Sequence, residues 1–291
     1  MKQETQNLLS NLEIVVEKLN SAYGGIGSAG EHPFHTFAWS ATEQGEFSFA
    51  ELLRSLGFLK IIGMTILVKE WESKTMYYSQ AQGVIQDLPI LINTLESQLK
   101  TLRAYQLKTY IKETCTLSTD GFNGFEACEF IVGETIDGDW IGICPCFPKP
   151  HTVGYGQRIT REVNIPCDST IALQQQIEPI LQKIKPAFVR YEAQVSLGVT
   201  WQSARKEEEL IEKLLESSCI VEIWEFKKFM QDLGNLDVDE KYAFLELDKF
   251  ANTYFQKPIL YVLGNWKLFR LYLVGKIKNG DSLGAVTAVD W

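Results

Sequence analysis

The chain has 291 residues, a net charge of −9, 45% hydrophobic residues and 22% charged residues, which is the balance of a globular protein with room for two domains of ordinary size. No apolar run approaches the roughly 18–20 residues that cross a bilayer, and residues 1–20 lack a signal-peptide profile, so we expect a cytoplasmic protein without a membrane partner. The acidic balance disfavours direct nucleic-acid binding, because phosphate contacts require a basic surface. Acidic charge can attract a basic protein partner, but it also serves solubility.

The first half predicts the order helix, strand, helix, strand, helix and three strands. Apolar residues recur at three- and four-residue spacing from Leu8 to Leu19, which predicts an amphipathic helix. A glycine-rich link leads from it into an aromatic strand that ends at Trp39. After a short helix, a β-branched strand is expected over residues 61–68. Another amphipathic helix begins around Leu88 and precedes the last three strands.

The second half predicts the same order. A helix over residues 171–184 leads into a strand that ends at Trp201, and a short helix and a β-branched strand follow. A longer amphipathic helix is expected over residues 239–254. Three strands then close this half as a meander, over residues 259–263, 267–274 and 283–289.

A shared hairpin pattern connects the two halves. Residues 130–143 read FIVGETIDGDWIGI and residues 272–285 read YLVGKIKNGDSLGA, and the two segments align without a gap. Asp137-Gly138 and Asn279-Gly280 fall at the same place and are typical of two-residue hairpin turns. We therefore predict two tandem copies of one α+β domain with mainly antiparallel sheets. The predicted domains cover residues 1–150 and 169–291, with a linker over 151–168.

Motifs for catalysis, cofactors and metals are weak. Residues 25–30 match G-x-G-x-x-G, but they follow a helix and precede a strand, which reverses the required order and favours a plain loop. Cys144, Cys146 and His151 lack the second ligand pair of a structural zinc site. No G-x-S-x-G motif occurs. We predict a non-enzymatic protein with no cofactor and no metal of its own.

Acidic residues are densest on the hairpin of the first copy. They could imitate phosphates toward a basic cleft of a partner. They could instead be solvated turn residues, which is the commoner reason for acidic hairpin tips. The residues are Glu126, Glu129, Glu134, Asp137 and Asp139.

Two segments resemble the nuclease A inhibitor family of cyanobacteria and other bacteria. Residues 31–39, EHPFHTFAW, look like the family's first strand. Residues 257–291 are similar to its closing meander, with Lys257-Pro258, then ILYVLG, LFRLYLVG, a Gly-Asp turn and LGAVTAVDW. In the first copy, EFIVGETIDGDWIGI resembles the same meander.

The resemblance implies an α/β/α sandwich around a mixed sheet in each copy. It also implies a protein that plugs the active site of a divalent-metal-dependent, sugar-nonspecific nuclease, where carboxylates compete for the metal and its basic neighbours. Asp290 and the Trp291 carboxylate, supported by Glu31, would contact the partner, with Glu134 and Asp139 as a second set. The alternatives are a regulatory or interaction module that keeps the fold without inhibition, and an enzyme or small-ligand binder that uses the glycine-rich loop.

Overall fold

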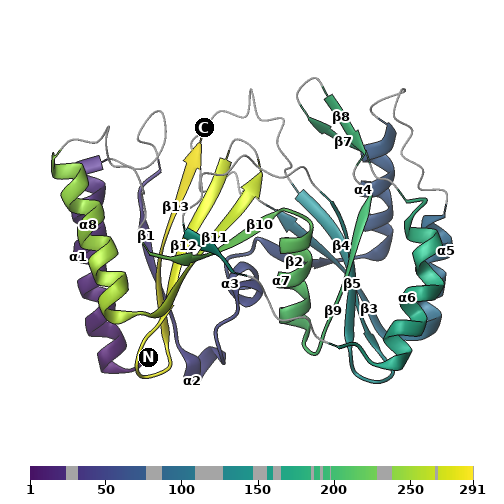
Figure 1. Cartoon of the computed structure of the whole chain (residues 1–291), viewed down its shortest axis with the longest axis horizontal. Coiled ribbons are helices and arrows are strands. Elements are labelled where there is room, and N and C mark those ends of the chain that lie inside the picture. Colours follow the sequence, from purple (N-terminus) through teal and green to yellow (C-terminus); the bar gives the residue numbers. More distant parts are fainter. Residues whose placement is uncertain are drawn as a thin grey trace. The chain divides into compact units, whose positions relative to one another are not determined.

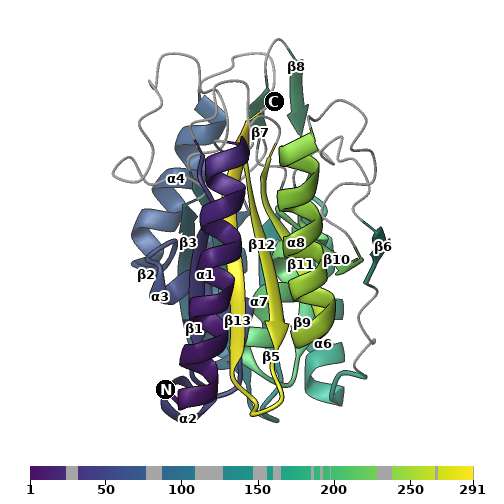
Figure 2. The same cartoon turned by 90° about the vertical axis from the view of Figure 1, so that its left-hand side faces the viewer.

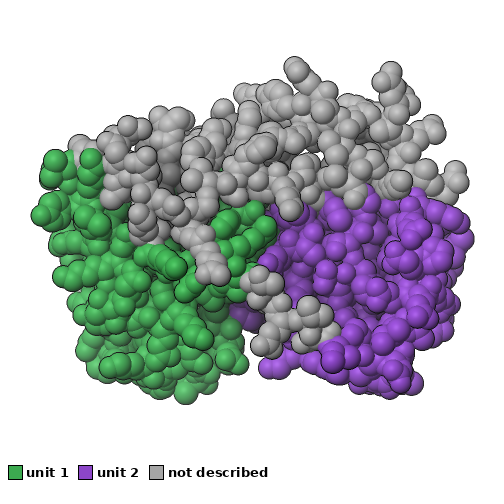
Figure 3. Space-filling view, viewed as in Figure 1, with its two compact units in different colours: residues 1–47, 150–161, 221–291 green, residues 48–149, 162–220 purple. Residues whose placement is uncertain are grey.

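The computed structural model describes residues 1–23, 32–76, 87–108, 127–146, 156–159, 165–184, 187–190, 193–196, 198–227, 238–265 and 268–290 (Figure 1). These residues form an α+β fold in which all described pairs of neighbouring strands are antiparallel, so the mixed sheet that the resemblance implies is not found among them. The chain divides into two compact units (Figure 3). Unit 1 comprises residues 1–47, 150–161 and 221–291, and unit 2 comprises residues 48–149 and 162–220.

Unit 1 is a six-stranded sheet with two long helices on one face (Figures 1 and 2). The strand order is β1-β13-β12-β11-β10-β6, and α1 and α8 lie side by side on the sheet. Its helices are α1 (Gln3–Tyr23), α2 (Ala41–Gln44) and α8 (Val238–Tyr254). Its strands are β1 (His35–Trp39), β6 (Gly156–Arg158), β10 (Val221–Phe226), β11 (Gln256–Asn265), β12 (Leu268–Lys276) and β13 (Ser282–Asp290).

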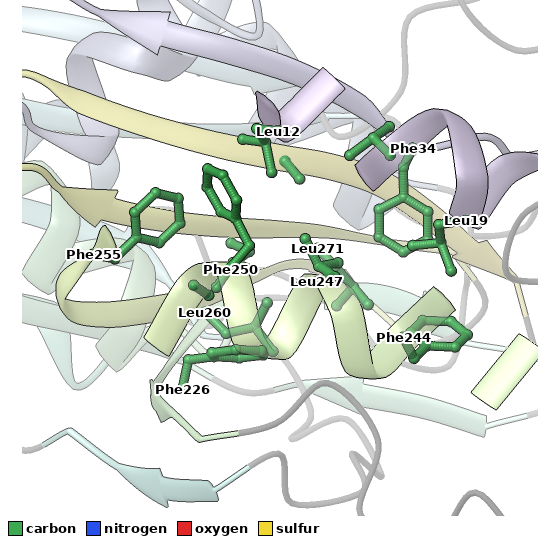
Figure 4. Packing of buried hydrophobic residues seen from close by; sticks show 14 of the residues in the cluster. Leu12, Leu19, Phe34, Phe226, Phe244, Leu247, Phe250, Phe255, Leu260 and Leu271 are labelled. Carbon is green, nitrogen blue, oxygen red and sulfur yellow. The ribbon is translucent and has the colours of Figure 1, made fainter. Parts of the chain in front are cut away.

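The core of unit 1 lies between the two helices and the sheet (Figure 4). Leu12 and Leu19 of α1 are fully buried there, as the three- and four-residue spacing predicts for one helix face. They share the cluster with Phe244 and Leu247 of α8 and with Leu271 of β12. Burial of such large side chains stabilises the unit by about 1.5–3 kcal/mol each.

Unit 2 is a five-stranded sheet with helices on both faces (Figure 1). The strand order is β2-β3-β4-β5-β9, and α4, α5 and α6 share a core with Ile131 and Ile143. On the other face, a Cβ added to Gly142 would lie 2.4 Å from the Leu214 side chain of α7, so this glycine lets the helix approach the sheet. The helices are α3 (Phe49–Ser55), α4 (Met64–Met76), α5 (Leu88–Gln98), α6 (Asp168–Leu181) and α7 (Glu207–Ser217). The strands are β2 (Leu59–Ile62), β3 (Leu99–Lys108), β4 (Ala127–Thr135), β5 (Trp140–Pro145) and β9 (Val199–Ala204), beside a two-stranded hairpin of β7 (Ala187–Arg190) and β8 (Ala193–Ser196).

Each unit combines segments of both sequence copies. We call α1 with β1 the N-terminal arm and α6 with β9 the central arm. The N-terminal arm completes unit 1, whose strands β10 to β13 come from the second copy, and in Figure 1 purple β1 lies beside yellow β13. The central arm completes unit 2, whose strands β2 to β5 come from the first copy. The compact units therefore differ from the contiguous domains expected at residues 1–150 and 169–291.

The two arms occupy equivalent places. Thr5 and Trp39 of the N-terminal arm align with Thr170 and Ala204 of the central arm at one constant shift, and Trp39 faces Ser282 as Ala204 faces Trp140. The prediction that Trp201 ends its strand is wrong. Trp201 lies inside β9, opposite Ile143. The register of β9 follows the whole central arm, α6 with β9, and not the position of one tryptophan.

Two further local predictions need correction. The strand expected over residues 61–68 ends at Ile62, and the Gly63 carbonyl accepts the amides of Ile66 and Leu67 at the start of α4. The segment after Gly63 forms helix α4 in spite of its β-branched residues, because the helix places Leu67 in the core. The expected linker includes β6, an edge strand of unit 1.

The repeated hairpin is present in both units, with a longer turn than predicted. Thr135 donates its amide to the Asp139 carbonyl at 2.8 Å, and Ile277 does the same with Asp281, so three residues rather than two form each loop. The third loop residue, Gly138 or Gly280, has a φ of 87° or 94°. Glycine is favoured at this left-handed position because it has no Cβ.

Candidate partner-binding site

The segments that resemble the inhibitor family's first and last strands lie next to each other in unit 1. β1 pairs with β13 in a register that places Phe37 opposite Gly284 and Trp39 opposite Ser282. A Cβ on Gly284 would lie 2.4 Å from the Phe37 ring, so the glycine makes room for this aromatic residue. Segments more than 240 residues apart thus form one pair of neighbouring strands.

The start of β1 is held firmly against α1 and β13. The Asn20 side chain donates to the Phe34 carbonyl at 2.9 Å and accepts the Phe34 amide at 2.8 Å. Phe34 is buried and meets the ring of Phe244 edge-on at 6.2 Å. Thr287 of β13 donates its hydroxyl proton to the His32 carbonyl at 2.7 Å. The chain just before β1 and the last residues of β13 therefore meet at one end of the sheet.

The three residues of the first predicted set lie close to this contact in sequence. Asp290 is the last residue of β13, and its backbone pairs with Leu268 of β12. Glu31 directly precedes His32 in sequence, but Glu31 and Trp291 lie outside the described residues. The structure thus brings together the chain segments next to Glu31 and Asp290.

The opposite end of β13 is anchored by a buried carboxylate. Asp281 accepts hydrogen bonds from the Thr5 hydroxyl of α1 and, at 2.9 Å, from the Ala41 amide. Its exposed fraction is 0%. Burial alone would raise the pKa of Asp281, but the hydrogen bonds from Thr5 and Ala41 outweigh it, so the pKa is lowered. This carboxylate joins the N-terminal arm to the hairpin of the second copy.

Asp139 plays the same part in unit 2, which does not fit the predicted contact with a partner. Its carboxylate is 2% exposed and accepts hydrogen bonds from the Thr170 hydroxyl at 2.9 Å and the Cys167 amide at 2.7 Å, and it forms an ion pair with Arg205 at 2.6 Å. Burial opposes the charge, but the bonds from Cys167 and Thr170 and the guanidinium of Arg205 lower the pKa of Asp139. Asp139 joins the central arm to the hairpin of the first copy.

The remaining acidic residues of that hairpin do not form one surface. Glu134 is half-buried, with its carboxylate 3.7 Å from the Lys100 ammonium. Asp137 is exposed at the turn, whereas Glu129 is fully buried and accepts from Gln106 at 3.0 Å. Glu126 lies outside the described residues. Only Glu134 and Asp137 of this set can meet a partner in the described structure.

A polar network in unit 2 was missed by the sequence analysis. The Tyr105 hydroxyl of β3 donates to the Glu207 carboxylate at 2.6 Å and accepts from Arg54 at 3.0 Å. Arg103 contacts the same carboxylate at 3.0 Å. Burial, followed by the hydrogen bond to Glu207, raises the pKa of Tyr105. The network connects α3, β3 and α7. No local motif predicts it, because Arg54, Tyr105 and Glu207 are far apart in sequence.

The weak ligand motifs gain no support. Residues 25–30 and His151 lie outside the described residues, and Cys144 is completely buried. Among the described ranges, no three His, Cys, Asp or Glu side chains are grouped so that they could hold a metal ion. Within the same ranges, every helix is too short or too polar to cross a membrane.

Comparison with known proteins leaves the family open. No model of a known protein family matches the chain, and no curated protein matches it significantly.

Proposed function

We propose that this is a non-enzymatic, protein-binding protein of the cytoplasm that inhibits a divalent-metal-dependent, sugar-nonspecific nuclease. The observation that carries the proposal is the pairing of β1 with β13, the two strands on which the resemblance to nuclease A inhibitors rests. They are neighbours only because the copies exchange arms, so unit 1 is the candidate inhibitor domain.

The contact surface would lie where His32 meets Thr287. Glu31 and Asp290 flank this contact in sequence, and their carboxylates would compete for the nuclease's metal ion and basic side chains. The net charge of −9 would speed encounter with a basic cleft. Asp139 and Asp281 take no part, because both carboxylates are buried in contacts with the arm of the other sequence copy. Glu134 in unit 2 is a secondary candidate.

The test is inhibition of a purified metal-dependent nonspecific nuclease. Plasmid DNA digestion is followed while the full chain is titrated in, and we expect digestion to stop at a stoichiometric excess. The paired change Glu31→Gln and Asp290→Asn should weaken inhibition at least about tenfold, the effect of losing charged contacts worth roughly 1.5–3 kcal/mol. Glu96→Gln, at an exposed acidic residue of α5 in unit 2 that belongs to neither predicted contact set, is the control and should have no effect.

Two outcomes would reject the inhibitor proposal. Digestion that continues at excess protein would exclude inhibition of that nuclease type. Binding to the nuclease without loss of its activity would favour the interaction module instead.

A further inference from the structure

The outer edge of strand β2 in unit 2 has the features of a peptide-binding edge. We propose that it binds an extended acidic segment of a partner protein as an added antiparallel strand. β2 is at the border of its sheet, and in the described part of the chain its only strand partner is β3. This site is separate from the proposed nuclease contact in unit 1.

Strand β2 of unit 2 corresponds to strand β10 of unit 1. Both strands follow a helix that ends in the same turn, in which Gly57 and Cys219 have φ angles of 75° and 64°. Further along, Ile61 pairs with Tyr105 as Ile223 pairs with Tyr261. β2 and β10 are therefore the same strand of the two units, position by position.

In unit 1 the outer edge of β10 already carries an added strand. β6 pairs antiparallel with β10, placing Arg158 opposite Trp224, and the Ile159 amide donates to the Ile223 carbonyl at 3.0 Å. An ion pair of 3.5 Å between Arg158 and the buried Glu222 accompanies these backbone bonds. The molecule thus contains an example of this edge holding an extended segment with a basic residue.

The equivalent edge in unit 2 is accessible and of opposite charge. Ile61 is 62% exposed, and its backbone carbonyl, like that of Ile223, faces away from the neighbouring strand. Lys60 replaces Glu222 and is exposed. Lys108, also exposed, donates its amide to the Phe58 carbonyl directly before β2. An acidic segment therefore fits this edge as a basic one fits β10.

Backbone hydrogen bonds would supply most of the affinity, as in other cases of strand addition. Lys60 and Lys108 would supply the selectivity for acidic segments. Short edge strands with lysine also prevent unwanted strand pairing. If the edge binds a segment, an acidic peptide should bind to it. If the edge only prevents strand pairing, no peptide should bind.

The probe is a labelled peptide of residues 155–161 that carries Arg158→Glu and Arg161→Glu, and its fluorescence anisotropy is followed with the full chain. We expect saturable binding that is tighter than that of the unchanged, basic peptide. Because the chain carries a net charge of −9, nonspecific attraction would favour the basic peptide instead. A preference for the acidic peptide would therefore show that it binds next to Lys60 and Lys108.

Two variants locate the contact. Ile61→Pro removes the outward amide, while Ile61→Thr keeps it, so only the proline variant should bind the acidic peptide about fivefold more weakly or worse. Lys60→Glu should reverse the preference toward the basic peptide, a gain that misfolding cannot produce. The proposal is overturned if the acidic peptide shows no saturable binding at millimolar concentration. It is overturned equally if Ile61→Pro and Lys60→Glu leave both affinities unchanged.

Discussion

The hydroxyl of Thr170 donates a 2.9 Å hydrogen bond to the buried carboxylate of Asp139. Thr5 makes the equivalent bond to Asp281 in the other unit. In each case the threonine belongs to an arm of one sequence copy and the aspartate to the hairpin of the other copy. The repeated Gly-Asp turn therefore has a physical role, which is to hold an arm in place.

Thr170→Val should lower the free energy of unfolding by about 1–3 kcal/mol, because the Asp139 carboxylate loses one hydrogen bond while it stays buried. Urea denaturation measures this change. Thr94→Val is the matched control, since its hydroxyl bonds only to the Ile90 carbonyl on an exposed helix face. Equal stability of the two variants would mean that the Thr170 bond does not hold the central arm.

Both buried aspartates should make stability depend on acid pH. Their folded-state pKa values are lowered, so their contribution is complete above the unfolded value of about 3.9 and is lost as pH falls through the folded pKa. Asp281→Asn removes its share of this contribution. The difference in melting temperature between wild type and Asp281→Asn should therefore shrink as the pH falls below about 4. A difference that stays constant down to low pH would contradict the lowered pKa.

Gly284→Ala should disturb the pairing of β1 with β13. The new Cβ would lie 2.4 Å from the Phe37 ring and 2.5 Å from the Leu273 carbonyl oxygen, and overpacking of this kind costs about 1–3 kcal/mol. Gly63→Ala is the control, because its Cβ would meet nothing within 4 Å and should cost less than about 1 kcal/mol. Thermal unfolding of both variants gives the comparison, and similar losses would count against the close packing of Phe37.

Tyr105→Phe tests the network between Arg54, Tyr105 and Glu207. Loss of the hydroxyl leaves the Glu207 carboxylate without its 2.6 Å donor, and we expect a loss of about 1–2 kcal/mol in the free energy of unfolding. Tyr242→Phe, at a residue that is 67% exposed, should be neutral. An unchanged stability of Tyr105→Phe would show that the ion pairs with Arg103 and Arg54 satisfy Glu207 without the hydroxyl.

Local chemistry in the sequence was enough to predict most elements. The spacing of Leu12 and Leu19 predicts α1, and Asp137-Gly138 and Asn279-Gly280 mark both hairpins. The third loop residue of each hairpin and the end of β2 at Ile62 were not predicted. Both depend on single backbone hydrogen bonds, such as those to the Gly63 carbonyl, which leave no pattern in the sequence.

The exchange of arms could not be predicted in the same way. Both arms carry the same threonine and the same apolar spacing, so local preferences fit either pairing equally well. Asp139 was expected at the surface, either in contact with a partner or as a solvated turn residue. Nothing near it in sequence shows that its carboxylate contacts Arg205 and Thr170. Trp39 and Trp201 were aligned because both are conspicuous, while the actual register follows Thr5 and Thr170.

The exchange itself can be tested most directly by disulfide cross-linking of β1. His35 faces Val286 in the structure, whereas in contiguous tandem domains it would face Cys144, the residue that aligns with Val286 in the first copy. We expect that mild oxidation of the variant with His35→Cys and Val286→Cys joins positions 35 and 286, as peptide mapping by mass spectrometry would show. A cross-link from position 35 to Cys144, in this variant or in His35→Cys alone, would contradict the exchange of arms.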